Sequence, residues 1–351
     1  MAKRSLRALV LGAGHGMRLR PLTDVIPKPL LPILGRPVIE HTLTDLAAAG
    51  CEAVAINLHH LGDAIKQRFG GAFRGMRLLY SHEPELLGTL GALGPLRDFV
   101  DEAELFLVVN GDSLCRWPLV KLVRRQRSSA AAATLLLTTR PNPKLFGGGV
   151  IVRRDGSLRS LRGGDREEKE HRRVFAGAHV FAPTVLQRAE QALAAGPADF
   201  VTDLYDPLLA AGETLMSLES HRHWHDLGTP ERYLAGARNW GLGRWPRRFW
   251  RSNWVAPGAT IDPESELHGS VVERGAVVGA GCRVERSLIL NGAHIGPGSH
   301  LRRAIIGPDI VVPDGSTIKR RLVTAARADV VTRAADSVVG GLVYSRFENQ
   351  P

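Results

Sequence analysis

Short apolar runs alternate with helical patterns of apolar and polar residues from residue 7 to about residue 230, as is typical of an α/β protein. Short apolar runs predict buried strands at residues 7–11, 52–56, 76–80, 105–109 and 132–138, and helical patterns lie at residues 37–49 and 61–69. Pro37 opens the first of these helices and Gly50 closes it. This alternation predicts a mainly parallel sheet with helices on both faces, whose ligands lie beyond the carboxyl ends of the strands.

The C-terminal part of the chain has a different and more regular pattern. Aliphatic residues recur in steps of six, six and five, with a period of 17 residues, at Val255, Ile261, Leu267, Val272, Val278, Val284, Ile289, Ile295, Leu301, Ile306, Val312 and Ile318. A small residue lies two positions before ten of these twelve residues, and Asn253 and Ile310 are the exceptions. Hexapeptide repetition of this kind predicts a parallel β-helix, whereas a series of short antiparallel strands needs no fixed period.

A segment rich in Trp and Arg, residues 240–254, separates the two regions and holds four of the six tryptophans. A basic aromatic segment can rest on a membrane surface, but Pro246 and two glycines interrupt any long amphipathic helix. We therefore interpret it as an interdomain connector. The expected organisation is a catalytic domain at 1–239, the connector at 240–254, the β-helix at 255–322 and a C-terminal extension at 323–351.

Composition excludes several classes of protein. The chain has 351 residues, of which 44% are hydrophobic and 23% charged, as expected for a globular protein of about two domains. No apolar run approaches the ~20 residues of a membrane span, and the short run after the basic N-terminus does not make a signal peptide, so we expect a cytoplasmic protein. Cys51, Cys115 and Cys282 are too few and too scattered for a disulfide framework or a metal-ligand motif.

The formal net charge of +11 raises the question of a nucleic-acid partner. Most of the basic residues are arginines, however, and they are spread over the whole chain without a basic stripe or a recognised binding module. We therefore expect no nucleic-acid partner and interpret the charge as an attraction for small anionic substrates.

A glycine-rich loop follows the first predicted strand and reads Leu11-Gly12-Ala13-Gly14-His15-Gly16-Met17-Arg18. Because glycine has no Cβ, the backbone N–H groups of such a loop can approach a phosphate closely. A dinucleotide fingerprint would need glycine at position 17 and an uninterrupted helix behind it, and Met17 and Pro21 argue against this. A Walker A loop is excluded because no Gly-Lys-Ser/Thr closes the motif.

Two basic residues accompany the loop. Arg18 can clamp a triphosphate, and Lys28 lies between Pro27 and Pro29, which fix the backbone and present the ammonium group at a defined place. Together the glycines, the arginine and the Pro-Lys-Pro run favour a nucleoside triphosphate site.

With these motifs the sequence resembles the sugar-1-phosphate nucleotidylyltransferases from Arg7 to about Ile318, and among them the mannose-1-phosphate guanylyltransferase group. The resemblance implies a Rossmann-like, mixed, mainly parallel α/β sheet of the nucleotide-diphospho-sugar transferase type, followed by a small left-handed β-helix. It also implies that the triphosphate is held by Leu11, Gly12, Ala13, Gly14, Gly16, Met17 and Arg18, and that Lys28 contacts the sugar phosphate. Met17 replaces the family's usual Thr or Ser, and we expect backbone contacts to compensate for most of the lost hydroxyl.

Further segments match the family in chain order. Glu83, Gly88 and Thr89 resemble the segment that reads the nucleobase, and Thr89 could equally lie near a helix N-terminus. Asn110-Gly111-Asp112 ends a buried strand, and the resemblance implies that Asn110 binds the nucleotide and Asp112 binds Mg²⁺. Outside this context an Asp after a strand is often a turn or N-cap residue.

On the sugar side, the resemblance implies roles for Gly147 and Gly148, within residues 146–150, and for Gly177, within Phe175-Ala176-Gly177. The run from His223 to Pro230 resembles the family's second metal motif, with Asp226 as the second Mg²⁺ ligand. The sequence departs from the family at Phe175, where Asn is common, and at Glu167-Glu168-Lys169-Glu170, where Glu-Lys-Pro is usual.

His221, His223 and His225 also suggest a zinc site. Alternate residues of a strand share a face, so these three imidazoles would point away from Asp226. The competing interpretation is a set of partly exposed strand histidines, and we favour it.

These features predict an Mg²⁺-dependent enzyme that transfers a nucleoside monophosphate from an NTP to a sugar 1-phosphate and releases pyrophosphate, with Arg18, Lys28, Asp112 and Asp226 as the catalytic set. The favoured substrates are GTP and mannose 1-phosphate. Alternatives are a uridylyl- or thymidylyltransferase acting on glucose, heptose or muramate 1-phosphate, and an inactive regulatory or assembly homologue. A bifunctional acyltransferase using His268, His294 or His300 is a third possibility. We expect the β-helix to form a homo-oligomer instead.

Overall fold

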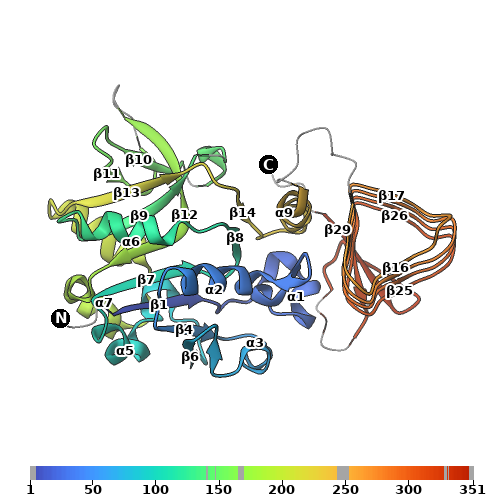
Figure 1. Ribbon diagram of the computed structural model, residues 1–351, viewed down its shortest axis with the longest axis horizontal. Coiled ribbons are helices and arrows are strands. Elements are labelled where there is room, and N and C mark those ends of the chain that lie inside the picture. Colours follow the sequence, from blue (N-terminus) through green and yellow to red (C-terminus); the bar gives the residue numbers. More distant parts are fainter. Residues whose placement is uncertain are drawn as a thin grey trace. The chain divides into compact units, whose positions relative to one another are not determined.

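The computed structural model describes residues 5–139, 141–146, 148–164, 170–242, 253–327, 330 and 332–347 (Figure 1). Its backbone contacts divide the chain into two compact units. The first comprises Met1–His15 and Ile39–Trp224, and the second comprises Gly16–Val38 and His225–Pro351. The glycine-rich loop therefore begins in one unit and ends in the other.

A twisted, mainly parallel sheet forms the centre of the first unit. Its strand order is β11-β10-β12-β7-β1-β4-β6-β5, and β9 pairs with β12 and β13. The strands are β1 (Leu6–Leu11), β4 (Ala53–Leu58), β5 (Ala72–Phe73), β6 (Met76–His82), β7 (Leu105–Asn110), β9 (Ala133–Thr138), β10 (Val150–Val152), β11 (Leu158–Ser160), β12 (His171–Phe181) and β13 (Leu215–Ser220). β8 (Ser113–Cys115) also belongs to this unit, and β14 (Trp224–Asp226) crosses the boundary between the units.

Helical segments connect these strands. The α-helices are α2 (Val38–Ala48), α3 (Gly62–Phe69), α4 (Gly88–Gly91), α5 (Arg97–Asp101), α6 (Leu119–Arg127), α7 (Glu190–Ala195) and α8 (Asp206–Ala210). The 3-10 helices are η3 (Gly94–Leu96), η4 (Pro143–Leu145) and η5 (Pro183–Ala189), and η6 (Val201–Tyr205) is a π-helix. The strands and helices expected from the periodicity of the first 140 residues are all present, with ends shifted by one or two residues.

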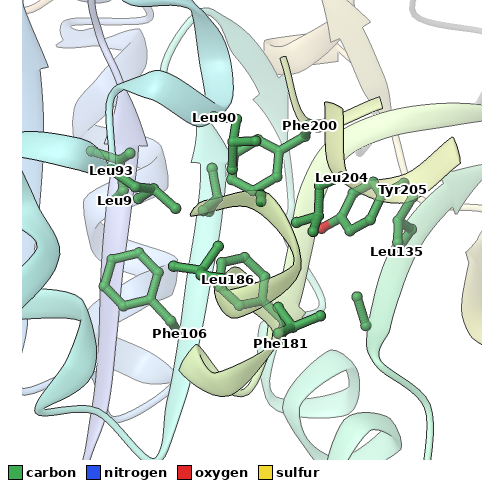
Figure 2. Close-up of a cluster of buried hydrophobic side chains, with 14 of the residues drawn as sticks. Leu9, Leu90, Leu93, Phe106, Leu135, Phe181, Leu186, Phe200, Leu204 and Tyr205 are labelled. Carbon is green, nitrogen blue, oxygen red and sulfur yellow. The ribbon is translucent and has the colours of Figure 1, made fainter. Parts of the chain in front are cut away.

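Side chains from the central strands and from the segment after β12 form one hydrophobic core. Leu9 on β1, Phe106 on β7 and Phe181 on β12 are fully buried, and Figure 2 shows them with Leu186 and Leu204 from the helices that cover this face. Every residue of β4 is buried, as expected for a parallel strand covered on both faces.

Three strands end level with one another. Leu11 at the end of β1 is in register with Asn57 of β4 on one side and with Asn110 of β7 on the other. The three strands run parallel, so their carboxyl ends form one edge of the sheet. The glycine-rich loop and the Asn110–Asp112 turn both leave from this edge.

The second unit contains the short elements that follow the glycine-rich loop, a long helix and the β-helix. The first group is η1 (Met17–Leu19), α1 (Leu22–Val25), η2 (Lys28–Leu30), β2 (Pro32–Ile33) and β3 (Arg36–Pro37). The long helix is α9 (Pro230–Leu242). No helix in the part of the chain that the structure describes has both the length and the apolar character needed to cross a membrane.

The β-helix has three faces of parallel strands, visible as stacked coils in Figure 1. One face consists of β15 (Trp254–Val255), β18 (Val271–Val272), β21 (Leu288–Ile289), β24 (Ile305–Ile306) and β27 (Arg321–Ala325), followed by the antiparallel β29 (Leu342–Arg346) and β28 (Ser337–Val339). The second face consists of β16 (Thr260–Ile261), β19 (Val277–Val278), β22 (His294–Ile295) and β25 (Val311–Val312). The third consists of β17 (Glu266–His268), β20 (Arg283–Glu285), β23 (His300–Arg302) and β26 (Thr317–Lys319).

The 17-residue period is the length of one coil. Val278 pairs with Ile295 and Ile295 with Val312, so residues 17 apart stack in the interior. Together with the mixed, mainly parallel sheet, this confirms the expected fold, an α/β domain followed by a left-handed β-helix.

Small hydroxyl residues at the corners form a second ladder. The Oγ of Ser270 donates to the carbonyl of Val284 at 3.0 Å and accepts from the N–H of Ser287 at 3.1 Å. Asn253, an exception to the small-residue pattern, makes the equivalent bonds through its amide, to Leu267 O at 2.8 Å and from Ser270 N–H at 2.9 Å. It therefore replaces a corner serine in the first coil. Most of the Trp- and Arg-rich segment, residues 243–252, lies outside the described residues.

Candidate active site

Asn57 holds the beginning of the glycine-rich loop. It lies near the end of β4 and is 3% exposed. Its Oδ1 accepts hydrogen bonds from the N–H groups of Gly12 at 2.8 Å and Ala13 at 3.4 Å. Both amides therefore have a partner within the protein, and their contact with a phosphate stays a prediction. These two hydrogen bonds fix the direction in which the glycine-rich loop leaves β1.

Glu83 secures Asn57 in turn. The carboxylate is 1% exposed, and its Oε1 accepts from Asn57 Nδ2 at 2.8 Å while its Oε2 accepts from the N–H of Leu87 at 3.1 Å. Both carboxylate oxygens are thus bonded within the protein, which suits a charge taken out of water. Glu83 connects the end of β4 to the segment before α4.

Two histidines extend this arrangement. His59 Nδ1 lies 2.7 Å from the carbonyl oxygen of Glu83, and its ring packs edge-on against His15 of the loop with the ring centroids 4.7 Å apart. The loop residue His15 is thereby in contact with the same cluster that holds Gly12.

Gly88 and Thr89 have structural partners in the segment before the π-helix η6. Gly88 has φ +79°, and a Cβ there would lie 2.4 Å from the carbonyl oxygen of Ala198, so only glycine fits. The Thr89 hydroxyl donates to Asp199 Oδ2 at 2.8 Å and accepts from the N–H of Phe200 at 3.1 Å. Thr89 is the second residue of α4, close to a helix N-terminus as the sequence suggested.

Asp112 reaches the carboxyl edge of the sheet through Gly111. The Gly111 N–H donates to Leu11 O at 2.9 Å, and a Cβ on Gly111 would lie 2.8 Å from the same oxygen. This close approach brings the turn after β7 against the end of β1. Asp112 is half-buried there, and its Oδ1 accepts from Ser113 Oγ at 3.3 Å.

Asn110 and Gly177 lie against one another. Gly177 has φ +86°, and a Cβ on it would be 2.6 Å from Nδ2 of Asn110. Strand β12 therefore lies close against β7 at these two predicted site residues. A side chain at position 177 would displace the Asn110 amide.

Aromatic residues lie next to this contact. The Trp224 indole donates to Ala176 O at 2.7 Å and packs against Phe146, with the ring centroids 5.4 Å apart. Gly148 has φ +81°, and its carbonyl accepts from Arg172 Nη1 at 3.0 Å. Gly147 and the stretch Glu167–Lys169, which were also singled out in the sequence, lie outside the described residues.

In the second unit, Gly16 bends the loop into the 3-10 helix η1. Gly16 is left-handed, with φ +60°, and a Cβ there would lie 2.9 Å from Thr23 Cγ2. The Thr23 hydroxyl donates to Gly16 O at 2.9 Å, and the N–H of Leu19 donates to the same carbonyl at 2.9 Å. This turn leaves Met17 and Arg18 exposed, with Met17 at 63%.

Arg18 and Asp226 meet at Gly228. A Cβ on Gly228 would lie 2.7 Å from Arg18 Nη2 and 2.9 Å from Asp226 Oδ1. The other carboxylate oxygen of Asp226 accepts from Arg232 Nη1 at 2.5 Å, and that arginine lies on α9. Two predicted site residues that are far apart in the sequence are thus neighbours.

Lys28 begins the 3-10 helix η2 within the Pro-Lys-Pro run. The N–H of Leu30 donates to Pro27 O at 2.8 Å and that of Leu31 to Lys28 O at 3.2 Å. The following Pro32 carbonyl accepts from the hydroxyl of Tyr233, which is fully buried, at 2.8 Å. Burial, with a further effect of the Glu273 carboxylate, raises the pKa of Tyr233 well above its usual value, so this hydroxyl keeps the proton that it donates.

Within the described residues, no three or more His, Cys, Asp and Glu side chains gather into a cluster that could hold a metal ion. His221 instead has its Nδ1 2.8 Å from the hydroxyl of Thr139. Mg²⁺ needs no such cluster, because it usually takes one or two carboxylates and completes its shell with water and substrate phosphates. The half-buried carboxylates of Asp112 and Asp226 are donors of that kind.

Comparison with known proteins identifies the class. A family model described as nucleotidyl transferase matches residues 7–240, and one described as GlmU-like, C-terminal hexapeptide, matches residues 247–339. The first match covers more than half of the chain, so the chain belongs to the nucleotidyl transferase family. This confirms the resemblance predicted from the glycine-rich loop.

Curated relatives carry more particular names. A mannose-1-phosphate guanylyltransferase of Mycobacterium tuberculosis is 32% identical over 294 residues, which are 81% of this chain and 79% of that protein. The catalytic subunit beta of the Drosophila pseudoobscura enzyme of that name is 30% identical over 233 residues, 66% of this chain. A beta-B form from Xenopus laevis is 29% identical over 235 residues. The matches span only 61% and 63% of the length of these last two relatives.

Three residues of the site were not predicted from the sequence motifs: Asn57, Gly228 and Arg232. Asn57 had a detectable signal, because it is a polar amide near the end of an otherwise apolar strand, as Asn110 is in β7. Gly228 lies within the matched His223–Pro230 run, but its importance depends on where Arg18 lies. No sequence pattern gives that placement.

Proposed function

We propose that this protein transfers a guanylyl group from GTP to mannose 1-phosphate, forming GDP-mannose and releasing pyrophosphate. The observation that carries the proposal is the close approach of Arg18 and Asp226 at Gly228, because a guanidinium beside a carboxylate suits a site for a triphosphate and its metal ion. The names of the relatives from Mycobacterium tuberculosis and Drosophila pseudoobscura support the choice of base and sugar.

In this reaction a phosphate oxygen of the sugar 1-phosphate attacks the α-phosphorus of the triphosphate, and the bond from the α-phosphorus to the bridging oxygen of pyrophosphate breaks. Both reactants are anions, so the protein must position them and offset their charge; no protein nucleophile is needed. Arg18 would hold the triphosphate and the leaving pyrophosphate, and Lys28 the sugar phosphate. Because the amides of Gly12 and Ala13 are bonded to Asn57, we expect the phosphates to meet the loop from Gly14 onwards.

We propose Asp112 and Asp226 as the residues that would hold Mg²⁺. When bound, Mg²⁺ would supply positive charge to the reacting phosphates. The ion pair between Asp226 and Arg232 orients that carboxylate, and the Gly111 turn keeps Asp112 at the edge of the sheet.

The test is a panel of GTP, UTP, dTTP and ATP against mannose, glucose, heptose and muramate 1-phosphates, scored by pyrophosphate release with Mg²⁺ present. We expect the highest rate for GTP with mannose 1-phosphate, and loss of release in Asp112→Asn with the fold retained by circular dichroism. Release with another pair would reassign the substrates. No release with any pair would favour the inactive regulatory homologue.

We also propose a cytoplasmic location and a homo-oligomer formed through the β-helix. All three cysteines are free and buried, which suits a reducing compartment. The exposed Val311, at 67%, lies on an outer face of the β-helix, where a second copy could cover it. Light scattering of the purified chain tests the oligomer, and a monomeric mass would contradict it.

A further inference from the structure

A single arginine of the C-terminal extension reaches the nucleotide loop. Arg333 lies between β27 and β28, and its Nη2 donates to the carbonyl oxygens of Met17 at 3.1 Å and Arg18 at 3.2 Å. All three residues belong to the second unit. The contact joins positions more than 300 residues apart in the chain, and the motifs of the catalytic domain gave no reason to expect it.

The arginine itself is held in place. The N–H of Arg333 donates to Asp336 Oδ2 at 2.8 Å, and the N–H of Asp336 donates back to Arg333 O at 2.9 Å. This reciprocal pair closes a tight turn just before β28. The guanidinium therefore extends from an ordered backbone, which reduces the entropy lost when it bonds to the loop.

The two bonds orient two successive peptide groups. A trans peptide is planar and its N–H points opposite to its C=O, so a carbonyl held toward Arg333 directs the next N–H away from it. The Met17 carbonyl thereby orients the N–H of Arg18, and the Arg18 carbonyl orients that of Leu19, which donates to Gly16 O at 2.9 Å. Both bonds come from an ionised donor, which makes them stronger than neutral ones.

We propose that Arg333 is a positioning residue for the triphosphate. It fixes the backbone of Met17 and Arg18, and with it the direction of the Arg18 guanidinium, and it adds a positive charge behind the loop. The inference rests on the proposed function for its substrate, since only an anionic ligand at this loop benefits from both effects. It also makes nucleotide binding depend on residues beyond the β-helix coils.

The kinetic test compares Arg333→Ala with Arg333→Lys in the full chain. The alanine variant should raise the KM for the nucleoside triphosphate about tenfold while changing the KM for the sugar 1-phosphate less than twofold, because the lost contacts are on the nucleotide loop. Lysine keeps a charge and a donor and should restore part of the loss. Arg346→Ala removes an equal charge from the exposed last residue of β29 and should match the wild type.

A second measurement separates this inference from the proposed function. Hydrogen exchange of the ligand-free protein reports the amides of Leu19 and Arg20, which bond within the loop, whether or not the protein is an enzyme. Arg333→Ala should exchange these amides at least several-fold faster, and Arg346→Ala should not. Unchanged exchange, or an unchanged nucleotide KM in an active protein, would overturn the inference. If the wild type were inactive but Arg333→Ala exchanged faster, the proposed function would be rejected, while the role of Arg333 in holding the loop backbone would stand.

Discussion

The guanidinium of Arg18 and the carboxylate of Asp226 crowd the same point in space, the position that a β-carbon would occupy on Gly228. Nη2 of Arg18 lies 2.7 Å from that point and Oδ1 of Asp226 lies 2.9 Å from it. Only glycine at position 228 leaves room for both groups in these positions.

Replacing Gly228 by Ala should reduce activity without unfolding the protein. The new methyl group must displace Arg18, whose long side chain can move at little cost, so the fold survives while the site is rearranged. A displacement of about 1 Å in a catalytic group lowers a rate by roughly a hundredfold, and we expect kcat/KM for pyrophosphate release to fall by about that factor.

Gly94→Ala is the matched control, because a Cβ at that position meets nothing within 4 Å. It should leave both activity and stability close to those of the wild type. An active Gly228→Ala protein would mean that the neighbourhood of Arg18 and Asp226 has no part in the reaction.

How far the sequence predicts this arrangement depends on the range of the interactions. The strands and the β-helix coils can be predicted from local patterns, because the apolar runs and the 17-residue repeat lie within short stretches of the chain. Asp112 could be placed at the carboxyl edge for the same reason, because it comes two residues after the end of a buried strand.

Contacts between distant segments leave no such periodic trace. Gly88 was expected to allow a nucleobase to approach, whereas its nearest neighbour is the backbone of Ala198. The sequence could single out Gly88 but could not reveal this neighbour, because Ala198 is an ordinary residue in a connecting segment. The contact of Gly88 with a nucleobase stays a prediction. The contacts of Arg333 with the loop and of Asn57 with Gly12 likewise join distant segments and leave no sequence pattern.

Replacing Gly88 by Ala should destabilise the protein whether or not a nucleotide binds. The left-handed backbone and the 2.4 Å approach of Ala198 O cannot be relieved by moving a flexible side chain, since the obstacle is backbone. We expect a loss of about 3 kcal/mol in the free energy of unfolding, measured by urea denaturation without ligand. Gly94→Ala again serves as the control. If Gly88→Ala had the same unfolding free energy as the wild type, the contact with Ala198 would not require glycine, and only a ligand could explain it.

Replacing Asn57 by Ala should weaken both the fold and nucleotide binding. The variant leaves the amides of Gly12 and Ala13 and one oxygen of Glu83 without their partner, and buried polar groups left unpaired cost about 1–3 kcal/mol each. We expect a raised KM for the triphosphate and an unfolding free energy lower by about 3 kcal/mol.

Asn57→Asp provides a sharper comparison. It keeps an acceptor for Gly12 but replaces the donor to Glu83 with a second negative charge. If the bond to Glu83 matters, this variant should be at least as unstable as Asn57→Ala at neutral pH. A fully stable Asn57→Asp protein would show that the Gly12 contact alone is sufficient.

Glu273 should make stability depend on pH near neutrality. This carboxyl group is fully buried in the β-helix and accepts from the N–H of Gly35 at 2.8 Å. Burial raises its pKa from 4.5 to about 7, against the opposing effect of the amides of Gly35 and Leu34. The folded protein therefore holds this proton more tightly than the unfolded chain, and protonation stabilises the fold. That contribution is fully present below pH 4.5 and is lost as the pH rises through 7.

The comparison of Glu273→Gln with the wild type measures this effect. Glutamine keeps the shape and cannot ionise, so the melting temperature of the variant should decline less than that of the wild type between pH 4.5 and pH 8. The rise in the pKa of Glu273 from 4.5 to about 7 corresponds to a change of about 3 kcal/mol at most in the free energy of unfolding. Glu285→Gln is the control, because that carboxyl group is on the surface and hydrogen bonding from Arg283 lowers its pKa. Its ionisation therefore changes the stability only at a pH below the range compared here. Parallel melting curves for Glu273→Gln and the wild type across this range would mean that Glu273 ionises in the folded protein as it does in the unfolded chain.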